Sequence, residues 1–276
     1  MFVEDYESAQ YYDALPRYGS DFYDFLYGNQ ININKNSVIA DVGCGTGRIM
    51  IDLLMRGSTV YGIDPDYNMR QICLEKCKQY LDHLNIIDGQ DSNMNIPDKS
   101  VDYVIVSQSF HRFNLKAFKE ECQRVLRCRS NIIIFWYRID YANPILKEML
   151  FSAKQNYMDY KSRYICPETI GAQTEAQENN ESAQKFFDNN STMYEINSHF
   201  GLNKEDFIPL GLSMALLPIA HEMNTISKVL NSSRFNKEAY IDDLNRIFTH
   251  YSIDGIMNLD YQIQVHTPIK SRRRSV

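Results

Sequence analysis

The stretch IADVGCGTGRIMIDLL, residues 39–54, places three glycines within five positions, between an apolar run and a run with helical spacing. The β-branched residues at 37–42 are typical of a buried parallel strand. Ile49, Leu53 and Leu54 then fall on one face of a helix. Because open α/β sheets bind ligands at the carboxyl ends of their strands, this turn predicts a ligand that lies close to bare backbone.

The alternation of strand and helix continues along the first half of the chain. Further strands are predicted at 58–64, 85–87, 101–108 and 131–137, and helices at 46–57, 67–84 and 115–126. Strands that alternate with helices at this spacing predict right-handed crossovers and a parallel sheet covered on both faces. The sequence therefore predicts a doubly wound α/β domain.

The second half of the chain is less regular. We expect helices at 141–163, about 220–231 and 236–250, and a short helix at 203–213 that Pro209 and Gly211 weaken. Residues 171–184 are polar and predict a mobile surface segment. Strands are expected at 193–201 and at 258–270, the latter with one polar face, as in an antiparallel or edge strand.

Composition and charge narrow the class of protein. The chain has 276 residues, 44% of them hydrophobic, and a formal charge of −6. This suits a globular protein of one large domain or of one domain plus a lid, and we favour the latter. The negative charge predicts no nucleic-acid or membrane partner, since only the tail KSRRRSV is basic. The residues MFVEDYESAQ predict no secretion signal, and the sequence has no apolar run of about 20 residues.

The six cysteines are scattered through the chain, which suits a reducing compartment and predicts a cytoplasmic protein. Cys73 and Cys77 are four residues apart, but a metal site needs two more ligands at matching spacing. Core or surface thiols, and no bound metal, are the expectation.

The spacing of the glycine loop indicates which nucleotide it holds. A nucleoside-triphosphate loop needs Gly-Lys-Ser/Thr, which is missing, and Arg48 stands where the dinucleotide fingerprint has its third glycine. Asp41 precedes the glycines at 43–47; a carboxylate there would repel pyrophosphate but suits an amino group. Asp64 ends the next strand, where an acid can accept ribose hydroxyls. These residues predict a nucleoside with a cationic, non-phosphorylated tail.

The motifs DVGCGTGR and YGIDPD resemble the signature of class I S-adenosylmethionine-dependent methyltransferases. IPDKSVDYVIVSQSFHRF (96–113) resembles the segment around the fourth strand in the small-molecule branch of that family, the methyltransferase type 11-like branch. FKEECQRVLRCRSNIIIFWYR (118–138) resembles the helix and strand that come next. The likeness is close over 37–138 and looser towards both ends.

The resemblance implies a Rossmann-like sheet of seven strands with an antiparallel final strand and helical lid insertions. The expected regions are an N-terminal helical cap (1–36), the S-adenosylmethionine-binding core (37–140), a lid insertion (141–192), strands and helices that complete the sheet and lid (193–270), and a basic tail (271–276).

The resemblance also implies a set of cofactor-binding residues. The adenine contact falls on Gln90 or Asp91, because DGQDSN stands where the family often has Gly-Asp-Ala. The amino-terminal tyrosines and Arg17 either close over the cofactor, with Arg17 pairing its carboxylate, or belong to a helix docked on the sheet. The full implied set is Asp41, Gly43, Cys44, Gly45, Gly47, Asp64, Pro65, Gln90, Asp91, Ser92, Ser107, Gln108, Tyr12, Arg17 and Tyr18.

The implied reaction moves a methyl group from S-adenosyl-L-methionine, leaving S-adenosyl-L-homocysteine, to an oxygen or nitrogen of a small molecule. His111, just past the fourth strand, is the candidate general base, or else a residue that shapes the pocket. Phe110 and Phe113 form pocket walls or core.

Two alternatives remain: a methyltransferase for a peptide, protein or RNA, and a non-catalytic cofactor-binding or scaffold protein. Against nucleic acid, SQSF replaces the Asn/Asp-Pro-Pro-aromatic run of enzymes that methylate base amino groups.

Overall fold

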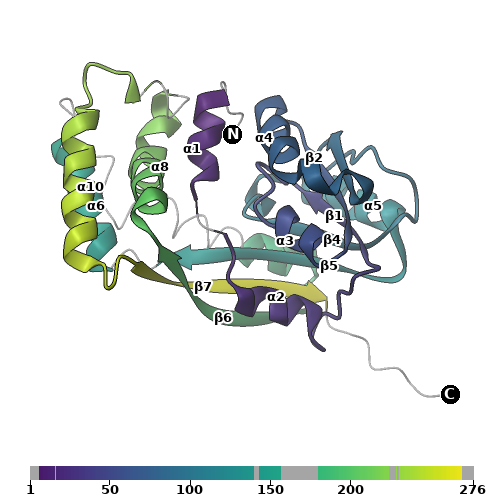
Figure 1. Ribbon diagram of the computed structural model, residues 1–276. Helices are drawn as coiled ribbons and strands as arrows, with labels where there is room; N and C mark the ends of the chain where they lie inside the picture. Colours follow the sequence, from purple (N-terminus) through teal and green to yellow (C-terminus); the bar gives the residue numbers. More distant parts are fainter. Residues whose placement is uncertain are drawn as a thin grey trace. The chain divides into compact units, whose positions relative to one another are not determined.

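The computed structural model describes residues 6–15, 17–139, 143–156, 180–223, 228 and 230–268. These residues fall into two compact units, drawn in Figure 1. The core unit comprises Asp21–Tyr137, Glu175–Ile196 and Gln262–Val276, and the helical unit comprises Met1–Ser20, Arg138–Thr174 and Asn197–Tyr261.

The described residues form a sheet of seven strands in the order β3-β2-β1-β4-β5-β7-β6. β1 pairs in parallel with both β2 and β4, so the strand order reverses beside β1. β3 joins β2, and β5 joins β4, also in parallel. The strands are β1 (Val38–Val42), β2 (Thr59–Asp64), β3 (Leu84–Asp88), β4 (Val101–Ser107), β5 (Leu126–Ile139), β6 (Ser191–Leu202) and β7 (Met257–Pro268).

The predicted fold class, a doubly wound α/β sheet of seven strands with an antiparallel final strand, is confirmed. In Figure 1 the arrows of β5 and β7 point in opposite directions. The polar face of the last strand also suggested an edge strand. The edge strand is β6 instead, since β7 lies between β5 and β6.

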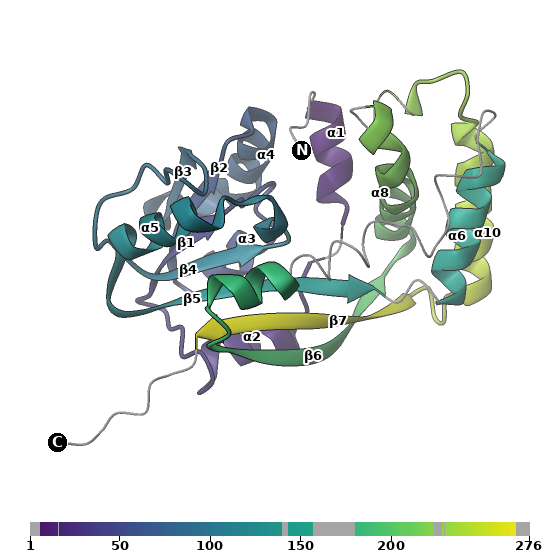
Figure 2. The same cartoon turned by 180° about the vertical axis from the view of Figure 1, so that it is seen from behind.

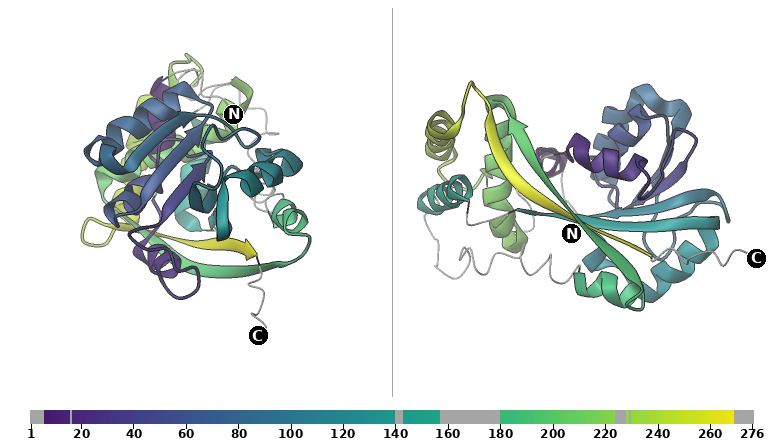
Figure 3. Two further views of the ribbon diagram at one scale, coloured as in Figure 1. Left: turned by 90° about the vertical axis from the view of Figure 1, so that its right-hand side faces the viewer. Right: turned by 90° about the horizontal axis from the view of Figure 1, so that it is seen from below.

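Helices cover both faces of the sheet in the core unit. On one face, the Phe22 ring of α2 packs 4.6 Å from the Phe135 ring of β5. On the other, Phe118 and Cys122 of α5 join the core formed by β1, β4 and β5. Figure 3 shows these two layers on opposite sides of the strands. The helices are α2 (Ser20–Tyr27), α3 (Met50–Met55), α4 (Tyr67–Cys77), η1 (Lys78–His83), η2 (Phe110–Arg112) and α5 (Leu115–Val125).

A short helix at residues 180–186 corrects the prediction of a polar surface segment over 171–184. Ala183 and Phe186 are buried in the same core as α5, and Figure 2 shows this helix over the sheet. The helix packs on the sheet although the segment is mostly polar, because its few apolar residues lie together on the face turned to the sheet. Residues 171–179 lie outside the described residues. The predicted lid range of 141–192 therefore includes a helix of the core unit.

The helical unit contains α1 (Tyr6–Asp13), α6 (Pro144–Gln155), α8 (Lys204–Met223) and α10 (Lys237–Tyr251). A helix forms where one was expected at 203–213, but it is not short: α8 is 20 residues long and continues to Met223. Gly211, expected to weaken this helix, lets α10 approach: a Cβ there would lie 2.6 Å from Leu244. The Gly211 carbonyl accepts a hydrogen bond from the Tyr240 hydroxyl (3.0 Å). Packing against α10 thus overrides the local helix propensity.

Asp243 on α10 connects two helices of this unit. Its carboxylate accepts hydrogen bonds from the Ser152 hydroxyl, the Asn156 amide (3.0 Å) and the Arg246 guanidinium. Burial alone would raise the pKa of Asp243, but these donors outweigh burial and lower it.

Of the helices in the described part of the chain, none combines the length and apolar character needed to cross a membrane.

Candidate active site

The glycine loop after β1 is held by β2. The backbone N–H groups of Gly43 and Cys44 both donate to the Ile63 carbonyl (2.8 and 3.1 Å). Gly43, Gly45 and Gly47 have φ values of 74°, 54° and 76°, a region that side chains rarely adopt. The loop shape therefore depends on glycine at these three positions.

Two of the glycines leave space for protein neighbours. A Cβ at Gly43 would lie 2.5 Å from Ser109 Oγ, and a Cβ at Gly47 would lie 2.5 Å from Cys73 Sγ on α4. The loop is therefore bare at Gly47 for close packing against α4, a reason that the sequence did not reveal.

Asp41, near the end of β1, has a buried carboxylate that accepts no hydrogen bond within the described part of the chain. It is 0% exposed, and neither oxygen has a hydrogen-bond partner among the described residues. Burial, followed by the charge of Asp64, raises its pKa to about 8, while Arg48 acts in the opposite direction. Leaving a buried carboxylate without a donor costs free energy, so the position fits a ligand that brings one.

Asp64 is buried beside the loop and is held by backbone N–H groups. Its Oδ2 accepts from Gly45 N–H (2.9 Å), and its Oδ1 accepts from Asp66 N–H (2.8 Å). Burial raises its pKa even so. A carboxylate oxygen can accept more than one hydrogen bond, so Asp64 keeps capacity for ribose hydroxyls. Arg70 donates to the Asp64 carbonyl (2.8 Å), which fixes the end of β2.

The carboxyl end of β4 lies at the same edge as the glycine loop, because β1 and β4 are parallel. Ser107 ends β4, and Gln108 follows with a φ of 60°, its N–H donating to the Phe135 carbonyl (3.2 Å). A non-glycine residue in this conformation is strained, as is common at functional sites. Ser109, which the sequence did not single out, donates from its hydroxyl to the Val42 carbonyl (3.2 Å).

His111 lies in η2 at this edge, and Arg112 donates from Nε to His111 Nε2 (3.0 Å). Because a guanidinium keeps its protons, Nε2 must be an acceptor, and the proton of the neutral ring then lies on Nδ1. The catalytic role of His111 stays a prediction. Phe110 is core: its ring contacts those of Phe118 and Phe186 at 5.9 and 5.5 Å.

The candidates for the adenine contact lie in the turn after β3. Gln90 is exposed, and its backbone pairs with that of Asn93. Asp91 is half-buried, and its Oδ2 accepts from Asn114 N–H at the start of α5 (2.6 Å). Both remain predictions, as do half-buried Ser92 and exposed Pro65.

Tyr12, Arg17 and Tyr18 belong to the helical unit. Tyr18 is buried, Tyr12 is half-buried and Arg17 is exposed. Their role in cofactor binding stays a prediction.

Arg48, Thr46 and Tyr137 are further residues of this edge, to which the sequence motifs assigned no role. Arg48 donates to the Tyr137 hydroxyl (3.3 Å), and its charge acts on the pKa of Asp41. Thr46 is buried, and its hydroxyl has no partner among the described residues. Thr46 and Arg48 stand within the glycine motif and were visible as candidates, whereas only strand pairing brings Tyr137 to this edge.

Comparison with known proteins agrees with this arrangement. Residues 40–134 match a family model described as a methyltransferase domain. An uncharacterized methyltransferase from Geobacillus sp. (strain WCH70) is 35% identical over 83 residues, covering 30% of this chain and 38% of that protein. A protein from Dictyostelium discoideum, provisionally named a methyltransferase, is 25% identical over 161 residues, covering 58% of this chain and 59% of that protein.

Among solved structures, one from Anaeromyxobacter dehalogenans, assigned provisionally to the type II methyltransferases, superposes with a TM-score of 0.57 at 18% identity. It covers 92% of this chain and 97% of that one, which shows a shared fold. The chain spans less than two thirds of the two curated relatives from Geobacillus and Dictyostelium.

The sheet reverses its strand order beside β1, where the glycine loop and the acid that ends β2 lie, and this is where open α/β sheets bind their ligands. The match of residues 40–134 to a methyltransferase domain and the shared fold support a class I S-adenosylmethionine-dependent methyltransferase.

Proposed function

We propose that this protein transfers a methyl group from S-adenosylmethionine to an oxygen or nitrogen atom of a small molecule. The observation that carries the cofactor part is the buried, unpartnered carboxylate of Asp41 next to Asp64. An ammonium group would satisfy Asp41, and a ribose would use the remaining acceptor capacity of Asp64. A phosphate in the same place would face two carboxylates.

In this proposal the protein contributes position more than acid–base chemistry. S-adenosylmethionine supplies an already activated methyl group. Asp41 holds the amino group of the cofactor and Asp64 holds its ribose, while the glycine loop and the strained Gln108 set the backbone around them. His111 contacts the acceptor. Its use as a base requires Nε2 to give up the hydrogen bond from Arg112, because Nε2 is the nitrogen that can take a proton.

The small-molecule part is supported by the segment after β4. An enzyme that methylates a flipped base needs an aromatic ring free to stack on it. Phe110, the aromatic residue of SQSF, is 1% exposed and packs in the core instead. The formal charge of −6 also disfavours a nucleic-acid substrate.

The described cysteines (Cys44, Cys73, Cys77, Cys122 and Cys128) are free thiols, which supports the cytoplasm as the compartment.

A two-step experiment tests the proposal. Calorimetry should show one site for S-adenosylhomocysteine in the wild type and none in Asp64→Ala. The absence of binding by the wild type would end the cofactor assignment. Radiolabelled S-adenosylmethionine is then supplied with host extract separated into small-molecule, protein and RNA fractions. Label in the small-molecule fraction is expected, and label confined to protein or RNA would replace the substrate class.

Substitution of His111 separates its two roles. If His111 is the base, His111→Ala should lower kcat by roughly 10²–10⁴-fold. If it shapes the pocket, the change should fall on KM. Lys116→Gln, an exposed change on the following helix, is the control that should alter neither.

A further inference from the structure

The core unit has a cleft at the opposite edge of the sheet from the glycine loop. Lys99 shortly precedes β4, and Leu126 and Arg127 begin β5, so the cleft lies at the amino ends of these parallel strands. The glycine loop lies at their carboxyl ends. The cleft has a volume of about 630 Å³, within the range of about 300–1,000 Å³ that is usual for small-ligand sites.

The floor of the cleft is apolar and the rim is cationic. Phe186 and Phe187 line it from the helix at 180–186 and the residue after it, and Leu126 lines it from β5. Three cations line it as well: Lys99, Lys119 and Arg127, against the single carboxylate of Asp188. An apolar floor below an excess of positive charge fits an organic anion with an apolar body.

The three cations differ in how their charge is balanced. Lys119 pairs with Asp188 (2.8 Å), and Arg127 pairs with both oxygens of Asp102 (3.1 Å each). The Lys99 ammonium donates only to the neutral Gln123 carbonyl, and within the described ranges it has no carboxylate partner. Lys99 is therefore the cation best placed to bind an anion.

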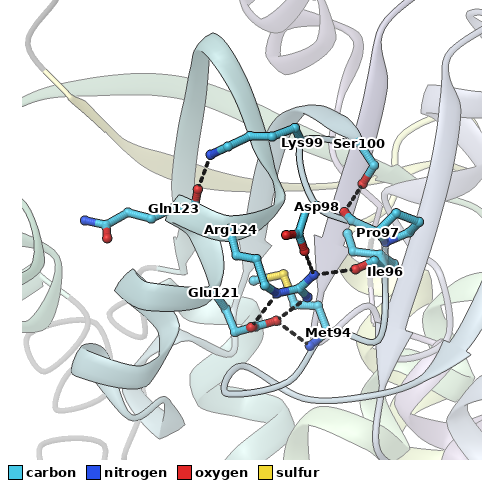
Figure 4. A network of polar contacts seen from close by, with 9 residues as sticks. All are labelled: Met94, Ile96, Pro97, Asp98, Lys99, Ser100, Glu121, Gln123 and Arg124. Atoms are coloured by element: carbon cyan, nitrogen blue, oxygen red, sulfur yellow. Dashed lines mark hydrogen bonds and ion pairs between the residues drawn. The ribbon is translucent and has the colours of Figure 1, made fainter.

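The segment that carries Lys99 is held by several hydrogen bonds. Figure 4 shows Arg124 at its centre, bonded to Asp98 and to the Ile96 carbonyl (2.7 Å each) and to Glu121 (2.8 Å). The Lys99 N–H donates to the Arg124 carbonyl (2.9 Å). Lys99 itself has a φ of 49°, a conformation that such surroundings must enforce. A preformed rim lowers the entropy cost of binding.

We propose that this cleft is a second binding site, separate from the cofactor site, for a small organic anion: a carboxylate whose apolar body lies on Phe186 and Phe187 while its charge pairs with Lys99. The body can be an aliphatic chain or an aromatic ring, and one carboxylate of each kind distinguishes the two.

Calorimetric titration of the full chain with decanoate and with naphthalene-2-carboxylate tests the proposal. At least one should bind at one site, and the stronger one identifies the kind of body. Lys99→Gln should weaken that binding by about tenfold, as expected for loss of a charged hydrogen bond. Lys116→Gln, the same charge change on the exposed side of α5, should leave it unchanged.

Three results would overturn the assignment. The first is no saturable binding of either anion. The second is equal binding of the neutral alcohol 2-naphthalenemethanol, which would make the site merely apolar. The third is loss of binding in Asp41→Asn, which would place the ligand in the cofactor site. Because none of these readouts uses methyl transfer, the result is independent of the proposed function.

Discussion

Asp41 in the core unit and Asp243 in the helical unit differ in their hydrogen-bond donors and in the direction in which their pKa is shifted. Asp41 is fully buried with no donor among the described residues, and its pKa is raised to about 8. Asp243 has three donors, and its pKa is lowered. A carboxylate that serves the fold is satisfied by the fold, whereas one left unsatisfied marks where a ligand belongs. Changes at the two acids and in pH test this contrast, and a substitution at Gly47 tests the glycine loop beside Asp41.

The largest effect is expected from Asp41→Asn. It keeps the shape but removes the charge that pairs with an ammonium group, so affinity for S-adenosylhomocysteine should fall roughly 100-fold, about 3 kcal/mol. The free energy of unfolding of the free protein at pH 7 should stay level or rise, because a buried unpaired carboxyl is removed. Calorimetry and urea unfolding measure the two. Unchanged affinity would contradict the assignment.

Gly47→Ala should destabilise the glycine loop by about 2–3 kcal/mol, since it adds backbone strain and forces a Cβ against Cys73. Gly255→Ala in the helical unit is a matched control, with a φ of 74° and nothing within 4 Å of the added Cβ. In the control, the free energy of unfolding should fall only by the backbone strain, about 1 kcal/mol. Equal losses in denaturant unfolding would show that the contact with Cys73 is unimportant.

Asp243→Ala should lower the free energy of unfolding by about 2 kcal/mol, because it removes the carboxylate that accepts from the Ser152 hydroxyl and from the Asn156 amide. Since the folded pKa lies below the ordinary value, this contribution is present at neutral pH and is lost as pH falls through the folded pKa. Asp242→Ala, exposed on the same helix, is the control. Hydrogen exchange should speed up in α6 and α10. Retained protection there would contradict the stabilising role.

The smallest effect is expected in the pH dependence of cofactor binding. Asp41 is protonated in the free protein below pH 8 and must ionise to pair with an ammonium group. Affinity for S-adenosylhomocysteine should therefore rise by up to about 1.4 kcal/mol per pH unit between about pH 5.5 and 7.

Calorimetry at pH 6.5 in phosphate and in imidazole should report about one proton released. Asp41→Asn should abolish the release. Pairing without ionisation would leave the binding heat the same in both buffers. For the free protein, the free energy of unfolding should fall as pH rises from about 4 to 8, because the folded state keeps a proton that the unfolded chain loses.

The local part of the molecule was predictable. Strand and helix alternation, the glycine loop and the acids at 41 and 64 depend on residues that are close in sequence. The failures came where distant segments meet. α8 persists through Pro209 and Gly211 because α10 packs against it, and the polar stretch before β6 contains a helix that the sheet holds.

For the site, the amino-acid sequence alone established the fold class and which acids flank the loop, because a carboxylate and a glycine turn carry their chemistry wherever the strand ends. Three-dimensional packing was needed to show that Asp41 lacks a donor, that Gly47 is bare for Cys73, that Arg112 donates to His111, and that three cations gather over two phenylalanines at the far edge. Burial, close approach and shared edges result from packing between segments far apart in the chain, which no local pattern encodes.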